Sequence, residues 1–267
     1  MINKDISFSV VIPAYKSENF IFKSVSSALN QSFSPLEVIV IVDPPFDSEL
    51  DILNRINDDR LIVLKNEKNM GPAYSRNRGW SIAKGNYVAF LDSDDIWFKD
   101  KLFYQSKIIE RYDPVLLSCE NIYSKDYIDR VNDSKEIVKR VSINKQLFKN
   151  RFHTSNVVVK KDLSIRFDEN YRMSEDFLLW SKIVSENKNC FYSNIVVSYY
   201  YEDEHKQGLS SNFKKIYRYG EKKVLSILRK EKRINLFQYL FFSLWLWMKY
   251  LIRRVFNRKV FANKKQD

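Results

Sequence analysis

The chain has 267 residues, 45% of them hydrophobic and 15% aromatic, which excludes a disordered protein and suits one sizeable domain with or without an appendage. Its formal net charge of +12 lies at the C-terminal end, because residues 214–267 hold 16 basic and 3 acidic side chains and the rest of the chain is nearly neutral. Nucleic-acid-binding proteins more often spread basic residues over a folded face, so this distribution favours a membrane-facing tail and no nucleic-acid partner.

The first 91 residues alternate between predicted strands and helices. Residues 7–12 predict a strand that Pro13 ends, and the helix that follows has Ser17 as its expected N-cap. The strands are continuous apolar runs, which is typical of a parallel sheet with helices on both faces. Ligands bind such sheets beyond the carboxyl ends of the strands. The further elements predicted here are strands at 36–42, 61–64 and 87–91 and helices at 48–56 and 72–84.

The second half of the chain is less regular. It contains no internal repeat and no Gly/Ser linker, so it is expected to complete the same domain. Ser174 is the expected cap of a helix that runs to about Glu186. The other predicted elements are strands at 115–119, 157–159 and 191–201 and a polar surface loop or flap at 124–140.

Cysteine usage and the N-terminus indicate a cytoplasmic compartment. Cys119 and Cys190 lie far apart without CxxC spacing, so we expect two reduced core thiols. Two histidines are too few for a His/Cys zinc site. The opening segment, MINKDISFSVVIPAY, has neither a basic region nor a small-residue cleavage site, so no secretory signal is expected.

The stretch FLDSDDIW, residues 90–97, places three carboxylates directly after a predicted buried strand. Neighbouring carboxylates repel, so burying them without a partner would raise the pKa of at least one. One explanation is a solvated loop in which Asp94 or Asp95 caps the next helix. The other is a site for Mg²⁺ or Mn²⁺ with a diphosphate completing the coordination shell, and the position after a strand of an α/β sheet favours it.

A second acidic pair, Glu175 and Asp176, occurs in MSEDFLLW. The pair alone is explained by the helix dipole, since negative charge is favourable in the first turn of a helix. That position also lowers the pKa of a carboxylate, which would weaken it as a base. Trp180, one turn further on, suits either the core or a position that stacks on a sugar ring.

Four segments resemble, in order and spacing, the family 2 glycosyltransferases with the GT-A fold: SVVIPAYKSENFIFKSVSSALNQSF, EVIVIVD, NMGPAYSRNRGWSIAKGNYVAFLDSDDIWFKDKL and MSEDFLLW. The resemblance covers about residues 7–210. It implies an α/β, three-layer GT-A fold with a mainly parallel central sheet and a helical C-terminal tail. The catalytic domain would span 1–212, with a nucleotide-binding half at 1–112 and an acceptor half at 113–212, and the tail would span 213–267.

The implied activity is transfer of a sugar from a nucleotide diphosphate to an acceptor hydroxyl, with inversion at the anomeric carbon. The DSD at 92–94 is similar to the family's DxD motif, so Asp94 would ligate Mn²⁺ or Mg²⁺ while Asp92 and Ser93 meet the donor. Such a cation offsets charge on the leaving phosphate. Asp176 resembles the family's general base, which takes the proton of the acceptor hydroxyl, and Glu175 would orient the acceptor or the base.

The resemblance also places residues around the nucleotide. Asp43 resembles the aspartate that meets the base, and Pro13, Ala14 and Tyr15 would line the same pocket. The family usually has DDGS where this chain has DPPF. The two prolines remove two backbone N–H donors, which leaves open which nucleotide base is bound and what Asp43 does. Arg76 is expected either beside the base or phosphates or on a solvated helix face.

His205, in YYYEDEHKQGLSS, loosely fits a family loop that closes over the donor. It would be a further contact for the metal or the diphosphate. The arginine usual in that loop is missing, and an exposed loop histidine remains the alternative.

Residues 236–252, LFQYLFFSLWLWMKYLI, contain 14 apolar or aromatic residues in 17 and precede four basic residues among 253–259. A spanning helix needs about 20 apolar residues, so the run is short for one. Three readings stay open: a helix in the interface of the inner leaflet, a helix docked on the protein or on a homodimer partner, and a short span. On a helix, Phe242 and Leu246 would interrupt a polar stripe of Asn235, Gln238, Lys249 and Arg253.

The sequence therefore predicts a metal-dependent, inverting glycosyltransferase that is peripheral on the cytoplasmic face of the inner membrane. Its substrates would be a nucleotide-sugar donor and a glycan or lipid-linked acceptor in the synthesis of O-antigen, capsule or a related polysaccharide. One rival is a nucleotidyltransferase, which would carry a Gly-rich, basic loop where this chain has PAYKSEN. The other is an inert, membrane-associated transferase-like domain, which only the DPPF departure favours.

Overall fold

The computed structural model describes residues 6–46, 48–124, 135–171, 173–201 and 220–263. The strands are β1 (Phe8–Ala14), β2 (Glu37–Val42), β3 (Leu61–Lys65), β4 (Tyr87–Phe90), β5 (Asp95–Trp97), β6 (Leu116–Ser124), β7 (Val138–Arg140), β8 (Val157–Lys160) and β9 (Cys190–Tyr201). The helices are α1 (Ile21–Leu29), α2 (Glu49–Asn54), α3 (Pro72–Ile82), α4 (Lys101–Tyr112), α5 (Ile143–Phe148), α6 (Glu175–Glu186), α8 (Lys222–Lys230) and α9 (Leu236–Asn263), with a 3₁₀ turn at Thr154–Asn156.

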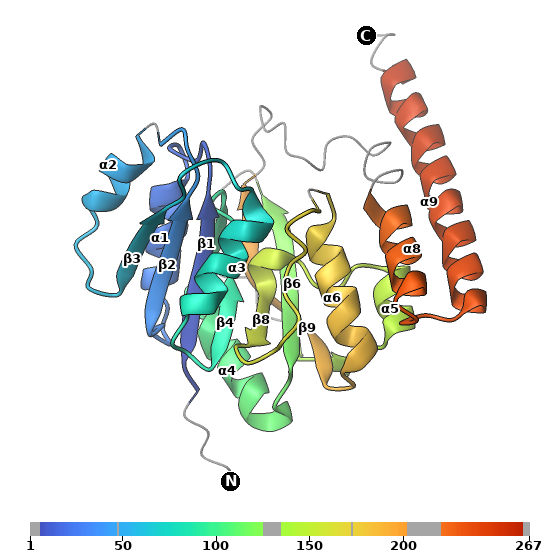
Figure 1. Ribbon diagram of the computed structural model, residues 1–267, viewed down its shortest axis with the longest axis horizontal. Helices are drawn as coiled ribbons and strands as arrows, with labels where there is room; N and C mark the ends of the chain where they lie inside the picture. Colours follow the sequence, from blue (N-terminus) through green and yellow to red (C-terminus); the bar gives the residue numbers. More distant parts are fainter. Residues whose placement is uncertain (1–5, 47, 125–134, 172, 202–219, 264–267) are drawn as a thin grey trace.

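The described strands form one sheet in the order β3-β2-β1-β4-β8-β6-β9-β5, with β7 added to β9 (Figure 1). The four strands of the first half pair in parallel, as their apolar runs predict. The second half adds antiparallel pairs, β4 with β8 and β8 with β6, before β9 pairs in parallel with β6. The carboxyl ends of β2, β1 and β4 therefore meet at one edge of the sheet.

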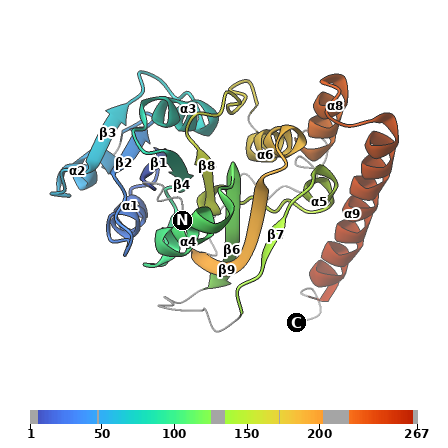
Figure 2. The same ribbon diagram turned by 90° about the horizontal axis from the view of Figure 1, so that it is seen from below.

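Helices cover both faces of the sheet, with α1 and α4 on one side and α3 and α6 on the other (Figure 2). The side chains of successive strand residues point to opposite faces of the sheet. Val10 and Ile12 belong to the core under α1 and α4, whereas Val11 belongs to the core under α3 and α6. Where both faces of a strand are buried, successive side chains are apolar, which explains the continuous apolar runs in the sequence. Cys119 and Cys190 are buried free thiols, as expected.

Strand β1 continues through Pro13, where the sequence predicted its end. Alternate residues of a strand direct their N–H and C=O groups to the same neighbour, so Val11 and Pro13 both face β4. The carbonyl of Val11 accepts a hydrogen bond from the N–H of Leu91 (3.1 Å), and β4 itself ends at Phe90. No β4 partner lies opposite Pro13, so its missing N–H breaks no ladder bond.

Two predicted caps and one predicted loop differ in the structure. Ser17 does not cap α1 with its side chain; instead its carbonyl accepts from the N–H groups of Phe20 and Ile21, and the helix begins at Ile21. Ser174 does occupy the N-cap position of α6, in a left-handed conformation and without a capping side-chain bond. Of the predicted loop at 124–140, residues 125–134 lie outside the described ranges, and Val138–Arg140 form the short strand β7, which pairs with β9.

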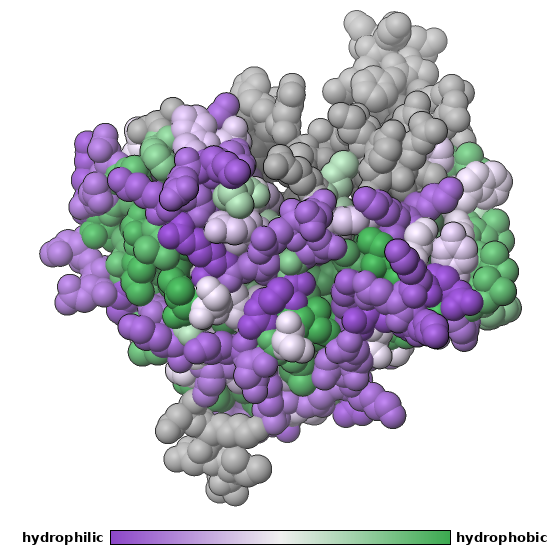
Figure 3. All heavy atoms as spheres, viewed as in Figure 1, coloured by the Kyte–Doolittle hydropathy of each residue, from purple (hydrophilic) through white to green (hydrophobic). Residues whose placement is uncertain are grey.

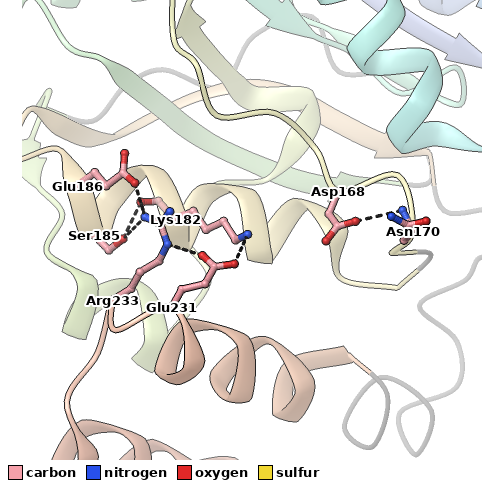
Figure 4. A network of polar contacts seen from close by, with 7 residues as sticks. All are labelled: Asp168, Asn170, Lys182, Ser185, Glu186, Glu231 and Arg233. Atoms are coloured by element: carbon pink, nitrogen blue, oxygen red, sulfur yellow. Dashed lines mark hydrogen bonds and ion pairs between the residues drawn. The ribbon is translucent and has the colours of Figure 1, made fainter.

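The C-terminal helices pack on the second half of the sheet domain, against α5 and α6. Figure 4 shows ion pairs that join α6 to the connection between α8 and α9: Lys182 to Glu231 (2.7 Å) and Arg233 to both Glu231 (2.6 Å) and Glu186 (2.5 Å). Within the described ranges, every helix falls short of the length and hydropathy that crossing a membrane requires. A third apolar core joins these helices to α5 and α6; among its members are Leu147, Phe177, Leu178, Val224, Leu225, Leu228, Phe242 and Leu246.

Candidate active site

The acidic loop after β4 is held by two serines from distant segments. The hydroxyl of Ser155 accepts from the N–H of Asp92 (3.1 Å) and donates to the carboxylate of Asp95, and the hydroxyl of Ser24 donates to the carbonyl of Asp92 (3.2 Å). Asp95 is buried and begins β5, so it does not cap the next helix. That alternative is wrong, because the loop turns into a short strand and α4 begins only at Lys101.

Arg76, on α3, connects the two acidic motifs. Its guanidinium donates to Asp92 Oδ1 (2.7 Å) and to Glu175 Oε1 (3.1 Å), and it lies 5.3 Å from the centre of the Phe167 ring. Only 6% of the side chain is exposed, so the solvated helix face is excluded. Burial disfavours the charged guanidinium, but Asp92 and Glu175 outweigh it and raise the pKa of Arg76 further above its usual value.

Glu175 and Asp176 form the first turn of α6, as predicted. Burial, followed by the negative charge of Glu175, raises the pKa of Asp176 to about 7. The N–H of Phe177 and the charge of Arg76 act in the opposite direction but are weaker. Its position in the first turn of a helix therefore does not leave Asp176 with a lowered pKa, because burial and the charge of Glu175 outweigh the hydrogen bond from Phe177 and the charge of Arg76.

Asp43, after β2, closes the loop that leads into α3. Its buried carboxylate accepts from the side chain of Asn66 (2.7 Å) and from the N–H groups of Met70 (3.2 Å) and Gly71 (2.9 Å). Gly71 has a φ of 84°, a conformation that other residues rarely adopt. Asp43 thus positions the start of α3, the helix that carries Arg76.

The predicted nucleotide-pocket residues lie at the same edge of the sheet. The carbonyl of Ala14 accepts from the N–H of Asp43 (2.9 Å), which joins the ends of β1 and β2. Ala14 is buried, Pro13 is partly buried, and the ring of Tyr15 is 46% exposed. Strand β1 lies between β2, which Asp43 follows, and β4, after which Asp92 comes. Tyr15 follows β1 at this edge, and the ammonium of Lys16 lies 5.6 Å from the centre of its ring.

Asp92 and Asp94 offer hard oxygen ligands to a divalent cation. The described residues contain no group of three or more His, Cys, Asp or Glu side chains placed to hold a metal. Mg²⁺ usually binds through one or two carboxylates plus substrate phosphates, so this donor set fits a cation shared with a diphosphate. His205, the other predicted metal contact, lies outside the described residues.

Three residues that hold Asp92 or Asp43 in place were not predicted from the sequence: Ser24, Ser155 and Asn66. Ser155 is 63 positions from Asp92 and Ser24 is 68 positions from it, so no local pattern links them. Trp180, for which two readings were open, is a fully buried core residue packed on Phe90 and Phe167.

Comparison with protein families places residues 9–166 within the model described as "Glycosyl transferase family 2". An Escherichia coli protein named UDP-Glc:alpha-D-GlcNAc-diphosphoundecaprenol beta-1,3-glucosyltransferase WfaP is 32% identical over 234 residues, which cover 86% of this chain and 91% of the relative. The Erwinia amylovora amylovoran biosynthesis glycosyltransferase AmsB is 34% identical over 189 residues, 65% of this chain and 62% of its own length.

Solved structures of S. aureus TarS 1–349 share the fold. The complex with UDP matches with a TM-score of 0.62 and 25% identity, covering 73% of this chain and 60% of that one. The complex with UDP-GlcNAc gives a TM-score of 0.69 at 24% identity, covering 85% of this chain and 66% of that one. The likeness confirms the three-layer α/β fold of GT-A type.

Proposed function

The chain belongs to glycosyl transferase family 2, and we propose that it moves a sugar from a nucleotide diphosphate to an acceptor hydroxyl with inversion at the anomeric carbon. One observation carries the proposal: Arg76 joins a carboxylate loop suited to a diphosphate-bound cation and a helix start whose Asp176 has a pKa near neutrality. The residues proposed to bind the donor and the residue proposed to act as the base would then lie together at one edge of the sheet. The family match makes a nucleotidyltransferase the weaker reading.

On the donor side, Pro13, Ala14, Tyr15 and Asp43 would surround the nucleotide, with Asp43 acting mainly by fixing the loop into α3. Asp94 would hold Mn²⁺ or Mg²⁺, with Asp92, Ser93 and His205 contributing to the metal and diphosphate site. When bound, the cation supplies positive charge against the negative charge that grows on the leaving phosphate. Arg76 would act through Asp92, whose carboxylate it fixes.

On the acceptor side, Asp176 would take the proton of the acceptor hydroxyl as its oxygen attacks the anomeric carbon. The attack comes from the face opposite the leaving diphosphate, which inverts the configuration. A carboxylate with a pKa near the working pH is well matched to this task. Glu175, held by Arg76, would orient the acceptor and keep the proton affinity of Asp176 high through its charge.

The relatives narrow the substrates that we propose. WfaP is named for a UDP-glucose donor and a diphosphoundecaprenol-linked acceptor, and this chain covers 91% of its length. A TarS chain has been solved with UDP. We therefore propose a UDP-sugar donor and a lipid-linked glycan acceptor for a surface polysaccharide, with the enzyme peripheral at the cytoplasmic face of the membrane.

The test is nucleotide release from a panel of UDP-, GDP- and dTDP-sugars with Mn²⁺, Mg²⁺ or EDTA. Asp94→Asn is compared with the wild type, and Asp59→Asn, which alters an exposed aspartate near β3, is the matched control. We expect one UDP-sugar to be turned over only with metal, and activity to survive in Asp59→Asn but not in Asp94→Asn. Turnover that neither EDTA nor Asp94→Asn reduces would refute the metal site.

A further inference from the structure

Helix α9 is docked on the protein, and two residues of its polar stripe, Gln238 and Lys249, face inward. Gln238 donates to Asn144 of α5 (2.7 Å), and Lys249 pairs with Glu221 near the start of α8 (3.1 Å). Phe242 and Leu246, which interrupt the stripe in sequence, are 3% and 2% exposed and belong to the core under α9. Gln238, Phe242, Leu246 and Lys249 therefore lie on the face of the helix that meets α5 and α8.

The opposite face of α9 is apolar and exposed. A helix on the surface of a globular protein normally turns its polar residues to water, whereas α9 has apolar residues on its exposed face as well as on its buried one. Figure 3 shows apolar side chains gathered along the right-hand edge of the molecule, over α9. We call the set the outer face: Phe237, Leu240, Phe241, Leu244, Trp247 and Met248, which are between 40% and 77% exposed.

The outer face continues into an apolar recess between α5 and the start of α9. The recess has a volume of about 540 Å³, and phenylalanines from both helices line it, among them Phe148, Phe237 and Phe241. The rings of Phe148 and Trp245 stack beside it at 4.2 Å. An exposed apolar patch of this kind marks an interaction site, and the recess extends it toward α5.

Two exposed lysines lie beside the outer face. Lys145 of α5 and Lys149, directly after that helix, are both adjacent in the chain to the turn that carries Phe148. The 28 residues of α9 include five basic and no acidic side chains. Aromatic and apolar side chains flanked by lysine and arginine suit the boundary between the headgroups and acyl chains of an anionic bilayer.

We propose that the outer face of α9, with the recess beside it, is the surface by which the protein docks on an anionic lipid bilayer. The helix would lie parallel to the bilayer and insert its aromatic residues among the upper acyl chains, while Lys145 and Lys149 meet the headgroups. A second copy is the less favourable occupant, because a two-fold interface places the same surface against itself and would bring α9, which has no acidic residue, against α9. The proposal gives the lipid-linked acceptor a route to the site, but docking does not require transfer to occur.

The experiment is flotation of the full-length protein with vesicles of phosphatidylcholine alone or mixed with phosphatidylglycerol, without donor or acceptor. The test variant is Phe237→Ser with Leu244→Ser on the outer face. The control is Phe22→Ser with Leu36→Ser, a matched pair of exposed residues on α1 and before β2, at the opposite end of the sheet. Circular dichroism melting confirms that both variants fold.

We expect wild type and control to float with the anionic vesicles and the outer-face variant to lose about tenfold in partitioning, since two large apolar side chains no longer enter the bilayer. Raised salt should weaken binding without abolishing it. Equal flotation of wild type and outer-face variant would overturn the proposal. So would an absence of vesicle binding together with a dimer that the outer-face variant dissociates, which would assign the face to a second copy.

Discussion

The acidic loop after β4 and the acidic start of α6 carry the same chemical groups in different surroundings. Asp92 keeps 35% of its side chain exposed, and its backbone is held by two serines. Glu175 is 13% exposed, and Asp176 beside it has its pKa raised by burial. An open, firmly held carboxylate suits a cation and a diphosphate, whereas a desolvated carboxylate suits a base. Arg76 touches both sites and sets their relative position.

The largest effect on activity is expected from a substitution at the acidic start of α6. Asp176→Asn keeps the shape of the side chain but removes the base, so kcat should fall by about 1,000-fold with little change in donor KM. Steady-state kinetics with saturating acceptor measure both constants. Asp168→Asn, an aspartate in the loop before α6 whose carboxylate accepts from the N–H of Asn170, serves as the control for a nearby loss of charge. A kcat within a few-fold of wild type would exclude Asp176 as the base.

Arg76→Gln breaks the connection between the sites. We expect kcat to fall by about 100-fold, the effect of losing a hydrogen bond between charged groups at a position that orients both carboxylates. Arg76→Lys should recover part of the loss, because it restores the charge but cannot bond both partners at once. Arg55→Gln, an exposed arginine, is the control. A loss confined to donor KM would instead mean that Arg76 contacts the donor directly.

The pH profile separates the two acidic residues of α6. The base must be unprotonated, so kcat/KM of the wild type should fall as the pH drops through about 7, the pKa of Asp176. Glu175→Gln removes the like charge that helps to raise this pKa, so the acidic limb should move to lower pH. Glu110→Gln, on the exposed side of α4, should leave the profile unchanged. An unmoved limb in Glu175→Gln would assign the titration to another group.

The smallest effect on activity is expected for Lys101. Like Arg76 it is a buried cation, but its pKa is lowered and that of Arg76 is raised. It is fully buried against Gln105 (2.6 Å) and the Trp97 ring (4.0 Å), and burial lowers its pKa to about 7. The unfolded chain therefore binds the proton more tightly, and stability should rise with pH between about 7 and 10, by on the order of 10 °C in melting temperature. Lys101→Met should flatten this rise, whereas exposed Lys107→Met should keep it. If the stability of Lys101→Met still rises over this pH range, another group is responsible for the rise.

The sequence by itself determined the α/β class and located the two acidic motifs that Arg76 joins in the structure. Alternating apolar runs and breakers are local signals, and they predicted the strands of the first half where the structure has them. Asp43 and Asp92 each follow such a run, so parallel pairing alone brings them to one edge. The first-turn acids of α6 were likewise predicted, because helix starts have local signatures.

Only the tertiary structure decided how these residues act. Arg76 bonds partners 16 and 99 positions away, and the pKa of Asp176 depends on the groups packed around it. The faces of α9 were undecided for the same reason, since a helical wheel shows which residues align but not which side meets α5 and α8. Local spacing determines secondary structure, whereas burial and charge pairing depend on contacts between segments far apart in the chain.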